Sequence, residues 1–220
     1  MEVYMKRIVP SLLIIIGILI LLIPTITGWV IKYSNRNIMD DDLNAIMVDN
    51  NDRDIDAEFD FSAIDDMDIL ALMRGNRYFD RNLLIGTILI PELDIHLPIM
   101  KGLTNTNLAV GAATMKPEQS FGIGNYTLAG HYMKNRDLLF GSLMDIEIGD
   151  TIYISNGERV YEYELYDTLV VPDTQMDLLS DDRADERGKP IVSLMTCYHS
   201  SKTGKRFFAL GELIDEHLVE

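Results

Sequence analysis

The pattern that most limits the fold of this chain is a series of short β-strand signals between residues 84 and 213. The clearest is a hairpin in which Thr151–Ser155 and Glu158–Leu165 flank the pair Asn156-Gly157. Along the second arm, tyrosine and leucine alternate with glutamate, which predicts one buried and one solvated face. Asn-Gly at this place predicts a type I′ turn. The chain is therefore expected to be built on antiparallel β-structure.

Five further runs have the same character, since each is short, rich in β-branched residues and bounded by turn residues. They are Leu84–Ile90, Ile95–Met100, Tyr126–His131, Ile191–Cys197 and Arg206–Leu213. Helical signals are limited to short pieces near Asn107–Thr114 and Asp137–Met144. At least seven short strands with few helices predict an all-β barrel or sandwich over residues 76–220.

A second feature lies near the start of the chain, where Ile8–Val30 holds 23 residues without a charged side chain. At about 1.5 Å per residue, this run can cross the roughly 30 Å hydrocarbon core of a bilayer. A cleaved signal peptide is the alternative, but the apolar run continues through Trp29, beyond a normal signal h-region. We expect an uncleaved transmembrane anchor over 8–30, preceded by a tail over 1–7.

Charge excludes one class of partner but does not orient this anchor. Lys6 and Arg7 before the apolar run are matched by Lys32 and Arg36 after it, so the positive-inside rule gives a tie. The whole chain has 19 Lys and Arg against 35 Asp and Glu, a net charge of −16. Nucleic-acid binding is not expected, because it depends on basic side chains that neutralise phosphates.

The acidic residues gather after the anchor, where residues 40–68 hold twelve of them and a single base, Arg53. We expect 31–75 to be an acidic stalk, with a solvated spacer over 40–60 that an anionic membrane surface repels. A capping pattern that begins at Ser62 indicates that the later part of the stalk is helical.

Three reactive side chains stand at the ends of predicted strands. Cys197, the single cysteine, ends an apolar strand, His131 ends another, and Arg206 opens the last one. A strand end at a barrel rim combines a rigid backbone with access to solvent, and these three types on one rim suit acyl transfer. The alternative is that the cysteine is a small buried hydrophobe and that the other two are ordinary exposed side chains.

These segments resemble the sortases, membrane-anchored cysteine transpeptidases of Gram-positive bacteria, and class A above all. The sortase signature Thr-Leu-x-Thr-Cys appears as Ser193–Cys197, with serine at its first position, and Ala-Gly-His appears as Ala129–His131. Arg206 matches the arginine after the cysteine loop, and Gly211–Leu213 matches the Gly-Glu-Leu that often closes the last strand. The resemblance covers residues from about 84 onward, plus the anchor. It implies the eight-stranded sortase β-barrel over 76–220, with short helices, as an extracellular catalytic domain on a single-pass membrane protein.

The resemblance also implies a reaction. Cys197 would cleave a Leu-Pro-x-Thr-Gly sorting signal between threonine and glycine, and the acyl group would pass to an amine of a lipid-linked peptidoglycan precursor. His131 would transfer protons, and Arg206 would hold the substrate or its oxyanion. The partners would be secreted proteins that carry the signal, which become anchored to the cell wall.

Further side chains are expected, by the same resemblance, to contact the substrate. These are Ala129, Thr196, Leu178 and Leu179. Some class A members bind calcium, but Asp181 and Glu118 are only approximate candidates here, and the chain lacks a cluster of acids upstream of Tyr126. We therefore predict no metal and no other cofactor.

Two alternative functions stay open. A pilin-polymerising sortase would be expected to carry a lid with an Asp-Pro-aromatic element, and no Asp-Pro occurs in the sequence. A catalytically silent, membrane-anchored barrel that binds peptides is the other, and the retention of all three reactive side chains argues against it.

Overall fold

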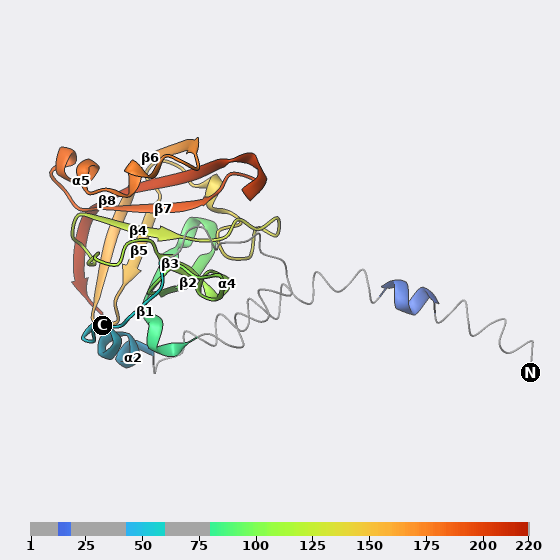
Figure 1. Ribbon diagram of the computed structural model, residues 1–220, viewed down its shortest axis with the longest axis horizontal. Helices are drawn as coiled ribbons and strands as arrows, with labels where there is room; N and C mark the ends of the chain where they lie inside the picture. Colours follow the sequence, from blue (N-terminus) through green and yellow to red (C-terminus); the bar gives the residue numbers. More distant parts are fainter. Residues whose placement is uncertain (1–12, 19–42, 60–79, 220) are drawn as a thin grey trace, which may run out of the picture.

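Eight strands close into a barrel in the computed structural model, which describes residues 13–18, 43–59 and 80–219 (Figure 1). The strands are β1 (Leu84–Ile90), β2 (Ile95–Met100), β3 (Ala112–Thr114), β4 (Asn125–Ala129), β5 (Thr151–Ser155), β6 (Arg159–Pro172), β7 (Ile191–Cys197) and β8 (Lys205–Leu218). Their order around the barrel is β1-β2-β3-β4-β7-β8-β6-β5, and β5 pairs with β1 to close it. The prediction of an all-β, eight-stranded barrel is confirmed. Two contacts, β2 with β3 and β4 with β7, are parallel where only antiparallel pairing was expected.

The predicted strand bounds hold best where turn residues lie on both sides. β1, β2, β5 and β7 begin and end as expected, whereas β6 and β8 extend to Pro172 and Leu218 because they pair with each other along almost their whole length. β4 ends earlier than predicted, at Ala129, so His131 lies just beyond the strand.

The helical elements around the barrel are short. They are α2 (Leu43–Asn51), α4 (Asn105–Val110), α5 (Asp182–Arg187), and the 3₁₀ turns η2 (Arg81–Leu83), η3 (Pro91–Leu93), η4 (Leu143–Asp145), η5 (Met176–Leu179) and η6 (Ser201–Thr203). The helix predicted near Asn107–Thr114 is α4, which begins earlier because Thr104 caps it. Of the helix predicted near Asp137–Met144, only the end is helical, as part of η4.

The β5–β6 hairpin forms as predicted, but its turn is shifted by one residue. The Asn156 amide donates to the carbonyl of Arg159 (3.1 Å), so the loop consists of Gly157 and Glu158. Only Gly157 has a positive φ (+92°), and glycine at the first central position is typical of a type II′ turn, so the predicted type I′ turn is wrong. A Cβ at Gly157 would also lie 2.7 Å from the carbonyl oxygen of Asn44 in α2.

Two apolar clusters lie on opposite faces of the barrel sheet because side chains alternate along each strand. The interior core includes three residues that are neighbours in the register of β4, β7 and β8, namely Leu128, Leu194 and Ala209. The outer cluster lies on the other face and comprises Leu103, Leu108, Ala113, Met115, Ala129, Val171, Leu178, Leu179, Phe208 and Leu210.

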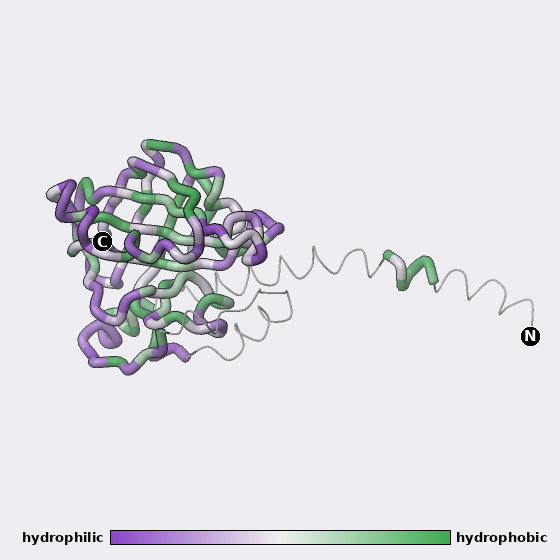
Figure 2. The backbone as a smooth tube through the Cα atoms, turned by 45° about the horizontal axis from the view of Figure 1, so that its top comes forward, coloured by the Kyte–Doolittle hydropathy of each residue, from purple (hydrophilic) through white to green (hydrophobic). Residues whose placement is uncertain are grey.

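The start of the chain is described only in part. Residues 13–18 are helical, and their leucine and isoleucine side chains are exposed. Most of this segment has the colour of hydrophobic residues in Figure 2. No helix in the described ranges is both long enough and apolar enough to cross a bilayer. The predicted tail over 1–7, the rest of the anchor over 8–30 and the helix signal at Ser62 lie outside the described residues.

The spacer predicted over 40–60 differs from the structure, because much of it packs on the barrel. Leu43 and Met47, one turn apart on α2, are buried in a small cluster with Leu84 at the start of β1. The folded unit therefore extends upstream of the predicted boundary at residue 76 and includes residues 43–59.

Asn50 holds α2 against the barrel, so its replacement tests directly whether α2 packs there. Its side chain is 2 % exposed, and Nδ2 donates to the carbonyls of Leu84 (2.7 Å) and Arg81 (2.8 Å). We expect Asn50→Ala to lower the free energy of unfolding by about 1–3 kcal/mol, because buried carbonyls lose their donor. Urea denaturation followed by circular dichroism measures this. Asn44→Ala, on the exposed face of the same helix, is the control, and equal effects of the two would contradict the assignment.

Candidate active site

Cys197 and Arg206 lie opposite each other on neighbouring strands. Cys197 is the last residue of β7 and pairs in the register with Arg206, near the start of β8. The Cys197 side chain is half-buried, and that of Arg206 is 23 % exposed. Directly opposed residues of antiparallel strands have Cβ atoms about 4.5–5.5 Å apart, so the register places the bases of the two side chains side by side.

His131 approaches from the other side of β7, where β4 runs parallel to it (Figure 1). Ala129 pairs with Met195, and the Gly130 amide donates to the Met195 carbonyl (3.0 Å). Continued by two residues, this register places His131 level with Cys197. Its side chain is only 7 % exposed. The three predicted reactive residues thus meet at one end of three adjacent strands.

Phe140 fixes the turn that carries His131. Its amide donates to the His131 carbonyl (3.2 Å), and its buried ring lies against Gly130. A Cβ at Gly130 would come within 2.3 Å of that ring, so only glycine fits before the histidine. The Ala-Gly-His sequence therefore has a packing reason in this chain.

Cys197 and Arg206 belong to the face of the sheet that carries the outer cluster. Met195 and Phe208, two residues away along β7 and β8, pack in that cluster, and alternation puts every second side chain on the same face. The thiol therefore stands at the edge of an apolar surface.

Arg206 has an acidic partner that the sequence did not indicate. Its Nη2 lies 3.8 Å from Oδ2 of Asp173, and its Nη1 donates to the carbonyl of Lys205 (3.1 Å). Asp173 follows β6, in which Val171 pairs with Arg206. These contacts hold the guanidinium on the outer face, close to the end of β7.

The residues predicted to contact substrate divide into two groups. Ala129, Leu178 and Leu179 all belong to the outer cluster on the face of Cys197, and each is buried. Leu178, at 1 % exposed, lies beneath the surface in this structure. Thr196 points to the opposite face, is 1 % exposed, and its hydroxyl has no hydrogen-bond partner among the described residues.

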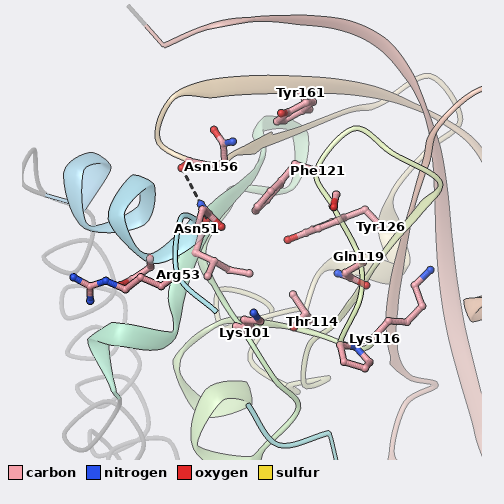
Figure 3. Close-up of a pocket in the computed structure, with 14 residues that line it drawn as sticks. Asn51, Arg53, Lys101, Thr114, Lys116, Gln119, Phe121, Tyr126, Asn156 and Tyr161 are labelled. Atoms are coloured by element: carbon pink, nitrogen blue, oxygen red, sulfur yellow. Dashed lines mark hydrogen bonds between the residues drawn. The ribbon is translucent and has the colours of Figure 1, made fainter. Parts of the chain in front are cut away.

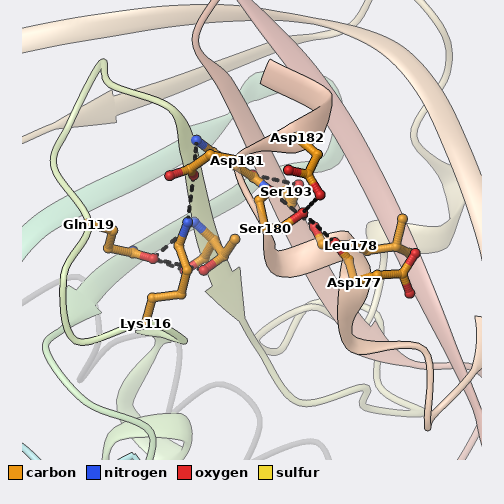
Figure 4. A network of polar contacts seen from close by, with 10 residues as sticks. Lys116, Gln119, Asp177, Leu178, Ser180, Asp181, Asp182 and Ser193 are labelled. Carbon is orange, nitrogen blue, oxygen red and sulfur yellow. Dashed lines mark hydrogen bonds and ion pairs between the residues drawn. The ribbon is translucent and has the colours of Figure 1, made fainter. Parts of the chain in front are cut away.

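Asn125 ties the segment with Leu178 to the barrel; Figure 4 shows Leu178, Ser180 and Ser193, to which it bonds. Its buried Nδ2 donates to the carbonyls of Leu178 (2.9 Å) and Ser180 (3.0 Å), and its Oδ1 accepts a hydrogen bond from the Ser193 hydroxyl (2.8 Å). The serine that replaces the usual threonine of the signature keeps the hydroxyl that this network requires.

Comparison with known proteins agrees with this arrangement. The family model described as the sortase domain matches residues 88–214. Sortase A of Listeria monocytogenes is 33 % identical over 209 residues, which cover 95 % of this chain and 91 % of that protein. The chain belongs to the sortase family. Sortase A of Bacillus anthracis is 35 % identical over 155 residues, 70 % of either chain.

The fold of solved sortases agrees as well. A crystal structure of Listeria monocytogenes sortase A superposes with a TM-score of 0.58 at 34 % identity, covering 63 % of this chain and 92 % of that one. Sortase C-1 of Actinomyces oris shares the fold at 20 % identity, with a TM-score of 0.55. As a sortase, the chain is a cysteine transpeptidase that anchors proteins to the cell wall.

Asp181, one of the two approximate calcium candidates, binds a lysine in this sortase. Its Oδ1 accepts hydrogen bonds from Lys116 Nζ (2.8 Å) and from the Asn125 amide (2.9 Å), and Figure 4 shows Lys116 reaching Asp181. Glu118, the other candidate, is exposed. In the described part of the chain, no three His, Cys, Asp or Glu side chains are grouped to hold a metal ion. The ammonium of Lys116 links the loop before β4 to the loop before β7.

The ion pair between Lys116 and Asp181 is expected to make the stability of the fold depend on pH. The hydrogen bond from Lys116, followed by that from the Asn125 amide, lowers the pKa of the Asp181 carboxyl. The ionised carboxylate therefore stabilises the folded protein at any pH above its ordinary pKa, about 3.9. This contribution is lost as the pH falls through the lowered pKa that Asp181 has in the folded protein. We expect Lys116→Ala to raise the Asp181 pKa towards 3.9, with under about 1 kcal/mol lost at neutral pH because solvent reaches the carboxylate and screens the pair.

NMR titration of the Asp181 carboxyl carbon measures this shift. Lys189→Ala is the control, because Lys189 pairs with Glu212 and not with Asp181. An Asp181 pKa that is the same in Lys116→Ala and in the parent would show that Lys116 does not perturb it.

Three rings to which the sequence assigns no role stand beside the sortase site, and one of them, His199, is expected from the sequence to be structural or exposed. Tyr132 follows His131, and Tyr198 and His199 follow Cys197. The ring centroids of Tyr198 and His199 are 4.3 Å apart, and those of Tyr132 and His199 are 6.1 Å apart. His199 has a positive φ of +61°, which non-glycine residues adopt uncommonly, and is exposed. Only their positions next to the reactive residues could have pointed to them.

Proposed function

We propose that this sortase uses Cys197 to cleave a Leu-Pro-x-Thr-Gly-like sorting signal between threonine and glycine, and then transfers the acyl group to an amine of a peptidoglycan precursor. The observation that carries the proposal is the register that sets Cys197 opposite Arg206 and level with His131.

In the first step, the Cys197 thiolate attacks the threonine carbonyl carbon, and a C–S bond forms as the C–N bond to glycine breaks. The guanidinium of Arg206 donates hydrogen bonds to the oxyanion of the tetrahedral intermediate, since it stands beside the thiol. The departing glycine amine takes its proton from His131, which leaves a thioester on Cys197 and a neutral imidazole.

In the second step, an amine of the acceptor attacks the thioester carbonyl. His131 accepts the proton that this amine loses, and the thiolate of Cys197 leaves as the new amide forms. The thioester reaches the amine only if water is kept from it, which an apolar surface around the thiol favours. The outer cluster supplies such a surface.

The same cluster suits the apolar start of the sorting signal. Ala129 and Leu179 belong to it, and Met176 is an exposed apolar side chain on η5, the element that also carries Leu178 and Leu179. We propose that leucine and proline of the signal pack there, with η5 adjusting to uncover Leu178. Thr196 acts from the interior side, through the position of β7.

A membrane anchor over 8–30 completes the proposal, with the barrel outside the cell. It is supported by the uncharged run of 23 residues and by the exposed apolar side chains of helical residues 13–18. An anchor would keep the enzyme where secreted proteins emerge and where lipid-linked precursors lie.

The test is to incubate the full chain, in detergent micelles, with Leu-Pro-x-Thr-Gly peptides that vary x, and with triglycine as the acceptor. We expect mass spectrometry to show a product in which triglycine replaces the residues after threonine. Peptides with threonine and glycine exchanged are the control and should give none. If no peptide of the series is cleaved, the chain is a silent binding barrel or acts on another signal, and the proposal fails.

A further inference from the structure

His131 and Cys197 both lie just beyond the stretch over which their two strands pair. The register of β4 with β7 ends at Ala129 and Met195, and the Gly130 amide then donates to the Met195 carbonyl (3.0 Å). Each reactive residue follows the last pair by two positions. The pairing of these strands alone therefore does not fix their separation, and contacts made by the residues after them help to set it.

The chain that leaves Cys197 is fixed to the barrel on the side of β8. Cys197 pairs with Arg206 in the register of β7 with β8. The Tyr198 amide donates to the Lys205 carbonyl (3.1 Å), and the Tyr198 carbonyl accepts a hydrogen bond from the Thr203 hydroxyl (2.9 Å). The Tyr198 ring packs against the interior core. This end of β7 is therefore a firm support for contacts to the end of β4.

Three rings connect this support to the turn that carries His131. His199 lies against Tyr198, with ring centroids 4.3 Å apart and the planes tilted by 58°. It also meets Tyr132, the residue after His131, edge to face, with centroids 6.1 Å apart. Edge-to-face pairs at such separations are attractive beyond the area that they bury. The rings thus form a side-chain link between the ends of β4 and β7.

The backbone of His199 also indicates that this link is specific. Its φ is +61°, in the left-handed region, which few residues other than glycine adopt. Such a conformation costs free energy, and it persists where surrounding contacts compensate for the cost. The contacts of the His199 ring with two neighbouring rings are of this kind.

We propose that Tyr132 and His199 are positioning residues for the transpeptidase reaction. Their ring contact ties the turn that carries His131 to the fixed end of β7, and so keeps the imidazole where it can transfer protons at the thioester of Cys197. Neither ring takes part in the proton transfer itself. The inference rests on the proposed function, because it gives these rings a part in the same acyl transfer.

A cavity of about 310 Å³ at the other end of the barrel provides the matched control (Figure 3). The rings of Phe121 and Tyr161 in its wall have centroids 6.0 Å apart, close to the separation of the proposed pair. Phe121 also stacks on Tyr126, which pairs with Val192 near the start of β7, whereas Cys197 ends that strand. Phe121→Ala therefore removes a comparable ring contact away from the reactive residues.

The test is steady-state kinetics of the full chain in detergent micelles, with a Leu-Pro-x-Thr-Gly peptide and triglycine. Tyr132→Ala should lower kcat about tenfold and change KM for the peptide less than about twofold, because it misplaces a reacting group and leaves the apolar surface intact. Tyr132→Phe keeps the ring and should stay within about twofold of the parent kcat. Phe121→Ala should lower the melting temperature but leave kcat within about twofold.

Two variants of His199 separate the role of its ring from that of its backbone. Asparagine adopts the left-handed region readily but has no ring, whereas phenylalanine keeps a ring and tolerates that region less well. We expect His199→Asn to lower kcat about tenfold and His199→Phe to lower it less than about threefold. The reverse order would assign His199 a backbone role, and an equal loss in both would mean that the imidazole itself is required. Either result, or no loss in His199→Asn, overturns the proposal.

Alkylation of Cys197 by iodoacetamide tests the same geometry without any peptide. A neighbouring imidazolium stabilises the thiolate, so Tyr132→Ala should slow alkylation at neutral pH about threefold or more, and Tyr132→Phe should not. If the parent cleaves no peptide, the proposed function fails, and these rates still decide the role of the rings. Alkylation of Tyr132→Ala at the parent rate or faster overturns the positioning role, as does a rise in KM with kcat unchanged.

Discussion

Replacing Cys197 with alanine is expected to abolish peptide cleavage, a loss of about 10⁴-fold or more, because no other group in the site forms the thioester. Release of the residues after threonine, measured with hydroxylamine as the acceptor, reports the acylation step directly. The thiol is half-buried at a strand end, so its loss leaves almost no cavity, and the melting temperature should stay close to that of the parent.

The control for this prediction is Glu147→Ala, which removes an exposed side chain in the loop between η4 and β5 and no reactive atom. It is expected to keep most of the hydroxylamine-dependent release. Should Cys197→Ala retain this release, the thiol is only a small hydrophobe and another nucleophile must be sought. Alkylation distinguishes the same cases, since iodoacetamide should inactivate the parent enzyme.

Replacing Arg206 with alanine is expected to lower kcat by about 10²–10³-fold, which corresponds to roughly 3 kcal/mol of lost oxyanion stabilisation. The register sets Arg206 directly opposite Cys197, and the guanidinium lies 3.8 Å from the Asp173 carboxylate. Arg206→Lys should recover only part of the rate, because an ammonium keeps the charge but loses the planar fork of donors. Steady-state kinetics with the sorting peptide measure these rates.

The matched control is Asp173→Asn, which removes the carboxylate charge beside Arg206 and keeps the arginine itself. The pair is partly exposed, so a change of no more than about fivefold is expected. If Arg206→Ala stayed within threefold of the parent rate, Arg206 would be an ordinary edge charge.

Much of the barrel and the identity of the site residues followed from local pattern. β1, β2, β5 and β7 are short runs between turn residues, and such runs show their ends in the sequence itself. Cys197, His131 and Arg206 stand at strand ends, and a strand end is visible without knowledge of its neighbours. That the three ends would meet was an expectation, and the registers of β4, β7 and β8 brought them together.

Other features escaped prediction because they depend on partners far along the chain. Because residues 40–60 are so acidic, the sequence did not indicate that Leu43 and Met47 would be buried. Their burial depends on packing against Leu84 at the start of β1. The hairpin turn shifted by one residue, with Gly157 close to α2, a helix more than a hundred residues away in sequence. Asp173 meets Arg206 only because β6 pairs with β8.

The sequence by itself determined the strand alternation, the glycine before His131 and the chemistry of the three reactive side chains, because these are properties of neighbouring residues. Only the tertiary structure decided which strands are parallel, that Asp181 binds Lys116, and that Asp173 lies beside Arg206. Closure of the barrel creates these contacts, and the register of a closed sheet is set by all of its strands together.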